Sequence, residues 1–358
     1  MDNYVYFPII KTRDAELRCF KNLDSETKNV IMPIYELTKS RRTSLVPDGD
    51  INRRMNDIKG IQKHEPFILD LTTDDRYINP QIEKLLDERN GFAEWQYFVF
   101  EQYRDLNIIP MIHLYGGGDY LEVKQFVSEA SKKVKSKRLA LRLPGDLAKK
   151  ELEEILINLK EVLEAECKLF VILDVGYFTG NDSLKKVSGD LITAYQVCEK
   201  YNAYISEVVI VSTSFPLNPA QAGKEDKSGS FEVFEEKLYY EVRRYAPDVK
   251  YGDYVSINIE QVELKAGTFV PRIDIISKEC NIFYYERYRR NEGGYVECAK
   301  AVKDNKEKNG YSDFGIWAND QIELAAKGIP EGISPSYWIS VRMNYYIYQK
   351  IKHREKDI

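Results

Sequence analysis

The chain of 358 residues has no long apolar run and no excess of positive charge. No stretch approaches the roughly 20 consecutive apolar residues that a membrane-spanning helix needs. The formal net charge is −5, so no general basic field would draw nucleic acid or an anionic membrane to the protein. The start, MDNYVYFPII, lacks the basic segment and apolar core of a secretory signal. We therefore expect a cytoplasmic protein with neither a membrane nor a nucleic acid as its partner.

Cysteine is scarce and scattered. The five cysteines, Cys19, Cys167, Cys198, Cys280 and Cys298, form no CxxC pair, which argues against a disulfide framework and a zinc knuckle. Such usage is typical of a reducing compartment. The sequence also has no HExxH, P-loop or GxSxG motif, so no familiar catalytic signature indicates the reaction.

Eight short apolar runs bounded by turn residues recur within residues 4–258, and segments of helical periodicity separate them. The runs are YVYFPIIK, VIMPIYEL, PFILDLT, NIIPMIHL, RLALRLP, LFVILDV, EVVIVSTSFP and KYGDYVSIN. Strands that alternate with helices predict parallel pairing with the helices outside. Eight such units match a (β/α)8 barrel, typically ~250 residues long. We therefore predict an α/β protein with a TIM-like barrel over residues 1–258.

An open, doubly wound sheet is the alternative architecture. It normally carries a glycine-rich turn after its first strand, whereas that position here reads IIKTRDAEL. The barrel is therefore favoured. Pro8 and Pro33 fall inside expected strands and would each remove a ladder donor, which indicates bulges or irregular first strands.

The pattern changes after residue 258. The segments TFVPRIDIIS and NIFYYERYRR predict a hairpin across SKEC, and helical stretches follow near residues 294–307, 319–327 and 336–352. We expect residues 259–358 to form an α+β appendage that packs on the barrel and replaces or covers its eighth helix. The last stretch mixes tyrosine with basic residues, as in single-strand binders. However, its apolar residues recur at three- and four-residue steps, which favours a packed helix face.

A polar residue ends each of the eight runs. In order they are Lys11, Glu36, Asp70, His113, Arg142, Asp174, Ser212 or Ser214, and Asp253. The carboxyl ends of the strands form the active-site mouth in characterised (β/α)8 enzymes, so these side chains are predicted to meet there. Any one of them also has a plain structural reading, because loops begin where strands end.

The residue types suggest roles for this set. Lys11, Arg142, Ser212 and Ser214 would bind the ligand, and Gly116 and Gly117 of YGGGDY would offer backbone N–H groups to an anion. Glu36, Asp70 and Asp174 are oxygen ligands suited to Mg²⁺ or Mn²⁺ as well as acid/base groups.

Proton carriers complete the predicted set. His113 and Asp253 would carry or orient protons, so the predicted catalytic residues are Glu36, Asp70, His113, Asp174 and Asp253. The set predicts metal-assisted hydrolysis of a phosphorylated or nucleotide-like ligand. A paired-carboxylate glycosidase is the competing chemistry.

The sequence contains an ordered series of short motifs: FPIIKTRDAEL, PIYELT, RLP, ILDVGYF, STSFP, YGDYVSI and PRIDII. This series resembles the beta protein family of phages and bacteria. The resemblance implies a barrel-like domain and a phage, prophage or defence-island setting, but no catalytic mechanism. The family usually has GD before a late helix and two histidines near the end. Here Asp320 stands in the first position, and Tyr345 and Tyr346 replace the histidines.

Two function hypotheses follow. The first is a hydrolase that uses the predicted mouth. The second is a non-catalytic recognition protein that binds a phage or defence-system protein or a nucleotide in a phage-conflict system. An enzyme needs the charged residues to line an accessible pocket, whereas a scaffold tolerates charges that are fully paired and closed.

Overall fold

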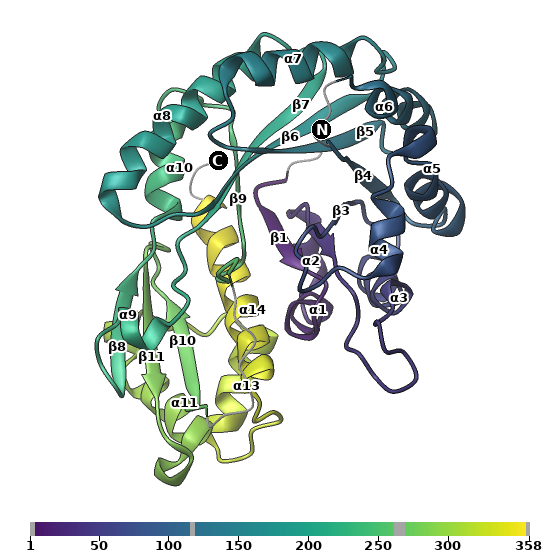
Figure 1. Ribbon diagram of the computed structural model, residues 1–358. Coiled ribbons are helices and arrows are strands. Elements are labelled where there is room, and N and C mark those ends of the chain that lie inside the picture. The colour runs from purple at the N-terminus through teal and green to yellow at the C-terminus, as the bar shows by residue number, and fades with distance from the viewer. Residues whose placement is uncertain (1–3, 115–118, 261–268, 356–358) are drawn as a thin grey trace.

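The computed structural model describes residues 4–114, 119–260 and 269–355. Eight parallel strands close into a barrel in the order β1-β2-β3-β4-β5-β6-β7-β9, and β10, β11 and β8 form a separate three-stranded sheet. Figure 1 shows this sheet and its helices beside the barrel, at the lower left. The closed barrel excludes the open, doubly wound alternative.

The strands have the following bounds: β1 Phe7–Lys11, β2 Ile34–Leu37, β3 Phe67–Leu71, β4 Ile108–Ile112, β5 Arg138–Pro144, β6 Lys168–Tyr177, β7 Ile205–Thr213, β8 Ser228–Glu232, β9 Lys250–Asp253, β10 Arg272–Ile276 and β11 Ile282–Arg287. All eight predicted runs therefore contain barrel strands.

The helices of the first 260 residues mostly follow barrel strands: α1 Asp14–Lys21, α2 Ser25–Asn29, α3 Ile51–Gln62, α4 Pro80–Leu85, α5 Arg89–Tyr97, the π-helix η1 Phe98–Gln102, α6 Leu121–Lys133, α7 Lys149–Lys160, α8 Gly180–Glu199, α9 Pro219–Ala222 and α10 Glu235–Arg243. The later helices are the 3-10 turn η2 Arg290–Glu292, α11 Gly294–Asp304, α12 Lys306–Asn309, α13 Trp317–Ala326 and α14 Pro335–Arg354.

The barrel closes between its first and last strands. Phe7 pairs with Gly252 and Pro8 with Asp253. A Cβ atom at position 252 would lie 2.6 Å from the Phe7 carbonyl oxygen and 2.7 Å from Val211, so only glycine fits this close approach. Pro8 therefore sits at the closing seam, whereas Pro33 precedes β2 and its carbonyl accepts a hydrogen bond from Ile68 N–H.

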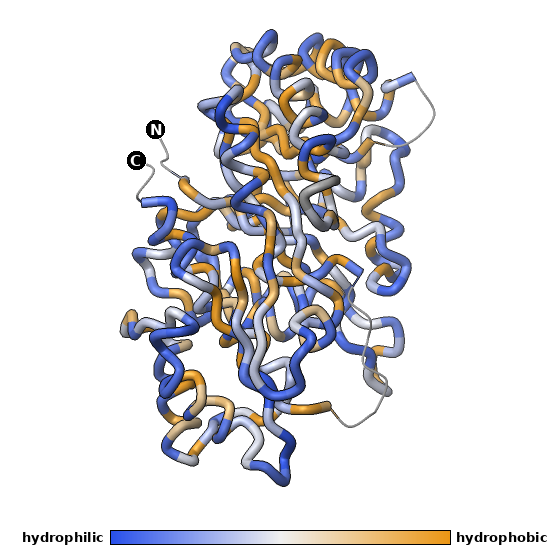
Figure 2. The backbone as a smooth tube through the Cα atoms, turned by 90° about the vertical axis from the view of Figure 1, so that its left-hand side faces the viewer, coloured by the Kyte–Doolittle hydropathy of each residue, from blue (hydrophilic) through white to orange (hydrophobic). Residues whose placement is uncertain are grey.

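Alternation along each strand divides the apolar residues into two cores. An inner core fills the barrel, and its members are Phe7, Ile9, Met32, Ile34, Ile68, Ile109, Met111, Ala140, Phe170, Ile172, Val209, Val211 and Tyr254. The residues of opposite parity face the surrounding helices and form a larger outer core. Figure 2 shows the resulting arrangement, with hydrophobic segments inside and hydrophilic segments mostly around the outside.

The second sheet combines distant parts of the sequence. β10 and β11 form the predicted antiparallel hairpin. β8, which comes from the segment between β7 and β9, pairs with β11 on the other side of the hairpin. The sequence of β8, SGSFE, lies in a polar stretch with little apolar alternation. The partner strand supplies the ladder that the local sequence does not specify.

Helix α14 takes the place of an eighth barrel helix, as expected. It lies against the seam between β9 and β1, where the Tyr346 hydroxyl donates to Asp253 at 2.6 Å. Asp253 also accepts hydrogen bonds from Tyr6 and from Tyr251. Lys350 of α14 is 0% exposed and donates to Glu236 at 2.5 Å and to Tyr251 at 2.7 Å. A buried polar network therefore attaches the last helix to the barrel.

The composition led to expectations about the cysteines and about membrane-spanning helices. All five cysteines are buried and free. Among the helices of the described residues, none combines the length and apolar character that crossing a membrane requires.

Lys350→Ala is expected to destabilise the protein by an amount toward the lower end of about 3–5 kcal/mol, because it removes the buried cation between Glu236 and Asp253, while Arg354 still pairs with Glu236. The control is Lys352→Ala on the same helix, where the lysine is half-exposed and its ion pair among the described residues is with Glu355. That variant should change stability by less than about 1 kcal/mol. Urea unfolding measures both. Equal midpoints for the two variants would contradict the proposed anchoring of α14.

Candidate functional site

An open pocket of about 780 Å³ lies at the carboxyl ends of the barrel strands. Six of the residues predicted from the strand ends line it, one from each of the first six strands: Lys11, Glu36, Asp70, His113, Arg142 and Asp174. This volume lies in the range of about 300–1,000 Å³ typical of small-molecule sites. The strand-end pattern therefore identified six of the residues that line one pocket.

Strand register explains why these side chains meet. Lys11 is the ladder partner of Glu36, and Glu36 is the partner of Asp70, so three neighbouring strands place polar residues side by side. Each also has the inward parity of its strand, two residues beyond an inner-core residue. The layer above the apolar barrel core is therefore polar and faces the mouth.

Arg142 is the centre of the charged layer. Its Nη1 donates to Asp70 Oδ2 at 2.8 Å and to Glu36 Oε2 at 3.3 Å. Its Nε donates to Asp174 Oδ2 at 2.9 Å, and its Nη2 lies 2.7 Å from the same oxygen. The planar guanidinium thus holds three carboxylates in fixed positions.

Tyr254 is part of this network, although the sequence reasoning did not select it. Its hydroxyl accepts a hydrogen bond from Arg142 Nη2 at 2.9 Å and donates to Asp174 Oδ2 at 2.5 Å. The alternation of side chains along β9 indicates this position. Gly252 packs against the inward-facing Val211, so Tyr254, two residues later, also points inward.

Burial changes the protonation of the network. Desolvation raises the pKa of Asp70, and Glu36 adds to the rise, although Arg142 opposes it. Burial opposes the charge of Arg142, but Tyr254 and the three carboxylates raise its pKa well above the usual value. Arg142 therefore stays charged, and Asp70 takes up a proton more readily than an ordinary aspartate does.

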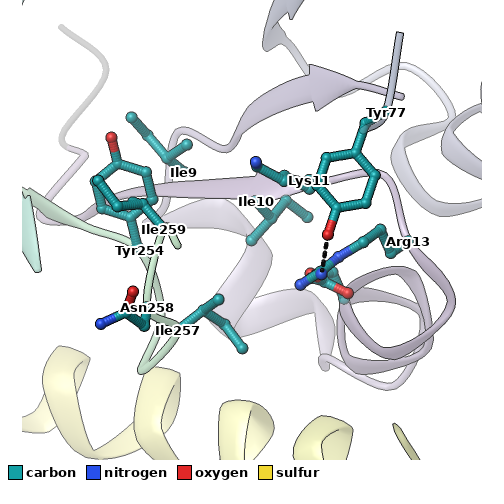
Figure 3. A pocket seen from close by; sticks show the side chains of 10 residues that line it. Ile9, Ile10, Lys11, Arg13, Tyr77, Tyr254, Ile257, Asn258 and Ile259 are labelled. Carbon is teal, nitrogen blue, oxygen red and sulfur yellow. Dashed lines mark hydrogen bonds and ion pairs between the residues drawn. The ribbon is translucent and has the colours of Figure 1, made fainter. Parts of the chain in front are cut away.

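Lys11 connects the pocket to a smaller cavity. Its Nζ lies 3.6 Å from Glu36 and 3.3 Å from Asp74, and 4.6 Å from the centre of the Tyr77 ring. Figure 3 shows Lys11 beside this ring and Arg13 directed at the Tyr77 hydroxyl, with a hydrogen bond of 3.1 Å.

The smaller cavity has a volume of about 20 Å³ and also touches Glu16. A water molecule needs about 10–15 Å³ measured in this way, so one water fits. Glu16 Oε2 is buried and accepts no hydrogen bond from the described residues, which makes it a natural partner for that water.

His113 forms part of the wall near β4. Its ring packs against Phe92 and Trp95, with ring centres 6.2 and 5.6 Å away. Burial lowers the pKa of His113 to about 4, so the imidazole is neutral at pH 7. Its Nε2 is buried and has no hydrogen-bond partner among the described residues.

The structure does not bring the other three predicted strand-end residues to the pocket. Asp253 has outward parity and joins the α14 network instead. Ser214 donates to Glu235 at 2.8 Å and accepts from Phe234 N–H, which places it at the start of α10. Ser212 is the ladder partner of Asp253 and shares its outward parity. Gly116 and Gly117 lie outside the described residues.

No metal-binding cluster is prebuilt in residues 4–114, 119–260 and 269–355, since no group of three or more His, Cys, Asp or Glu side chains is placed to hold an ion. The reason is visible in the pocket. Glu36, Asp70 and Asp174 direct oxygens at Arg142, so the guanidinium occupies the position that a shared metal ion would take.

Comparisons with known proteins cover nearly the whole chain. Residues 6–352 match the family model described as Beta protein. The Protein beta of Enterobacteria phage P4 is 29% identical over 366 residues, which span 99% of this chain and 95% of the phage protein. No solved structure matches the chain significantly.

The stability of the protein should fall as pH drops from about 6.5 to about 4, in part because of His113. Its pKa is lower in the folded state, so the unfolded chain binds the proton first in this window. A shift of this size corresponds to about 3 kcal/mol. His113→Gln should lose less stability than the parent over the same range, as measured by urea unfolding at each pH.

The control for this experiment is the exposed His64. His64→Gln should follow the pH profile of the parent. The explanation fails if His113→Gln follows that profile as well.

Proposed function

The chain belongs to the beta protein family, and we propose that its barrel mouth binds a phosphorylated or nucleotide-like ligand as a divalent-metal complex and hydrolyses it. The observation that carries the proposal is the charged layer around Arg142, which opens on a pocket large enough for a small molecule. Buried charge is costly, and a binding site is a common reason for an interior to hold four ionisable groups at one point.

The charge balance of the pocket determines the form of the ligand. Among the described residues, two basic and six acidic side chains line it: Lys11 and Arg142, and Glu36, Asp70, Asp74, Glu151, Asp174 and Glu260. A bare phosphate would meet a net negative surface. Mg²⁺ is commonly bound by one or two carboxylates together with substrate phosphates and several waters. A metal ion that enters with the ligand therefore satisfies both the acidic lining and the lack of a prebuilt cluster among the described residues.

The roles of the residues follow from their contacts. Lys11 extends from β1 to the pocket and neutralises a phosphate oxygen. Arg142 holds Glu36 and Asp70 on one nitrogen, which keeps the two carboxylates close enough to contact one metal-bound ligand. Asp70 acts as general acid or base, because burial raises its pKa. His113 stays neutral and contributes an uncharged wall.

A recognition protein is the second candidate. Its support is that Nε, Nη1 and Nη2 of Arg142 all bind protein groups, so the charged layer is complete without a ligand. A partner such as a phage or defence-system protein would then use the mouth as a rigid surface. The open pocket favours the enzyme, because a purely structural ion network gains nothing from an accessible cavity of this size.

Isothermal titration calorimetry with ADP, with and without Mg²⁺, tests the binding proposal. We expect binding that requires Mg²⁺. Arg142→Lys should weaken this binding about tenfold or more, because lysine loses charge-assisted hydrogen bonds with which Arg142 holds the carboxylates of the site, and one such bond contributes ~1.5–3 kcal/mol. Release of inorganic phosphate, followed by ³¹P NMR, tests hydrolysis. Asp70→Asn should abolish that release while keeping the binding.

The matched control is Arg342→Lys. Arg342 is also a buried arginine, bonded to Asp274 at 2.8 Å and to Ser256, but it does not line the pocket. This variant should lose stability without losing ADP affinity. A parent protein that binds no phosphorylated compound, with or without Mg²⁺, would overturn the proposal in favour of the recognition protein.

A further inference from the structure

The lining of the pocket has an apolar part beside the charged layer described above. Its apolar side chains come from the end of β5, from the β5–α7 connection, from α7, where the acidic Glu151 lies among them, and from the residue before α6. Its members are Tyr120, Leu143, Pro144, Leu147 and Ile155, which we name the apolar shelf. A site that only needed to bind phosphate would have no use for such a surface, since small-molecule sites use apolar walls to hold the uncharged part of a ligand.

The shelf begins directly beside the charged layer. Pro144 is the ladder partner of Asp174, and Gly145 N–H donates to the Asp174 carbonyl at 2.8 Å. Leu143 follows Arg142 in the chain. One ligand can therefore place a charged group at Arg142 and an adjoining apolar group on the shelf without a gap between them.

Tyr120 is the aromatic member of the shelf, and its backbone is unusual. It has φ 51° and ψ 10°, in the left-handed region that a non-glycine residue rarely adopts. Capping does not explain this conformation, because the Tyr120 side chain makes no capping bond to α6. Asp119 accepts from Leu121 N–H instead. Strained residues persist where their surroundings hold them, often at ligand sites.

Tyr120 is half-buried and packs against the outer core, as do Leu114, Leu147 and Val175, which also line the pocket. It is thus held against the pocket wall with part of its surface accessible. A flat aromatic group stacks on such a ring and lies over the aliphatic side chains next to it.

We propose that the apolar shelf binds a flat aromatic group, such as a nucleobase, that is joined to the charged part of the ligand, with Tyr120 as the stacking residue. This inference rests on the proposed function, because it names the substrate class of the same site. It narrows the phosphorylated ligands to those that carry a base-like ring, and it makes Tyr120 a specificity-determining residue.

Calorimetry with three probes separates the two parts of the site: AMP, ribose 5-phosphate and adenosine, each with Mg²⁺. AMP should bind the parent about tenfold more tightly than ribose 5-phosphate, given the usual contribution of base stacking. Tyr120→Ala should remove that difference and leave ribose 5-phosphate unchanged. Tyr120→Phe, which keeps the ring, should restore AMP affinity.

The control is Leu121→Ala. Leu121 is the neighbouring residue at the start of α6, is 64% exposed and does not line the pocket. The Leu121→Ala variant should bind all three probes with the affinity of the parent.

The outcomes distinguish the two proposals. Equal affinity of the parent for AMP and ribose 5-phosphate would overturn the proposal that the apolar shelf binds an aromatic group. It would not contradict the proposed phosphate site. Binding of adenosine that depends on Tyr120, without any gain from phosphate, would support the shelf and overturn the phosphate site. No binding of any probe would overturn both.

Discussion

The strands of a closed barrel alternate strictly between two surroundings, and most of this structure depends on that constraint. Successive side chains point into the barrel or toward the helices. The inward positions hold Phe7 and Ile9 of β1, Ile34 of β2 and Ile68 of β3, which fill the interior. Two residues further along each of the first six strands, the same parity reaches the mouth, where the side chains are polar or charged. The packed core and the polar layer are thus successive parts of the same inward rows.

Ion pairs offset the free-energy cost of burying charges in the polar layer. A guanidinium that is only 21% exposed is costly by itself, but Arg142 meets three carboxylates and a phenol within hydrogen-bonding distance. The same ion pairs determine where the carboxylates of the pocket point. They direct the carboxylates at Arg142 and not at one shared metal position, and they leave the lining acidic overall. The neutral state of His113 has a separate cause, which is the burial of its ring.

A second buried network of polar side chains lies at the seam between β9 and β1, where the barrel closes. β9 is short, and among the described residues no helix follows it before β10. Helix α14 covers the outer face of β9, and Asp253 accepts from three tyrosines while Lys350 joins it to Glu236. The polar contacts give this distant helix one defined position. The C-terminal helix thus packs on a barrel whose eight strands all lie within residues 7–253, while β8, β10 and β11 form a sheet of their own.

The sequence by itself determined the strand–helix alternation, the barrel, the hairpin and six of the residues that line the pocket, because apolar periodicity and strand ends are local properties. It also indicated the family, through a series of short motifs. Parity was present in the sequence too: Val209 and Val211 point inward, so Ser212 and Ser214 face outward, and Tyr254 rather than Asp253 reaches the pocket. Only the tertiary structure decided which charges pair with Arg142, that β8 joins the hairpin, that Asp253 belongs to α14, and that an apolar shelf adjoins the charged layer. These features depend on contacts between residues far apart in the chain, which no local pattern specifies.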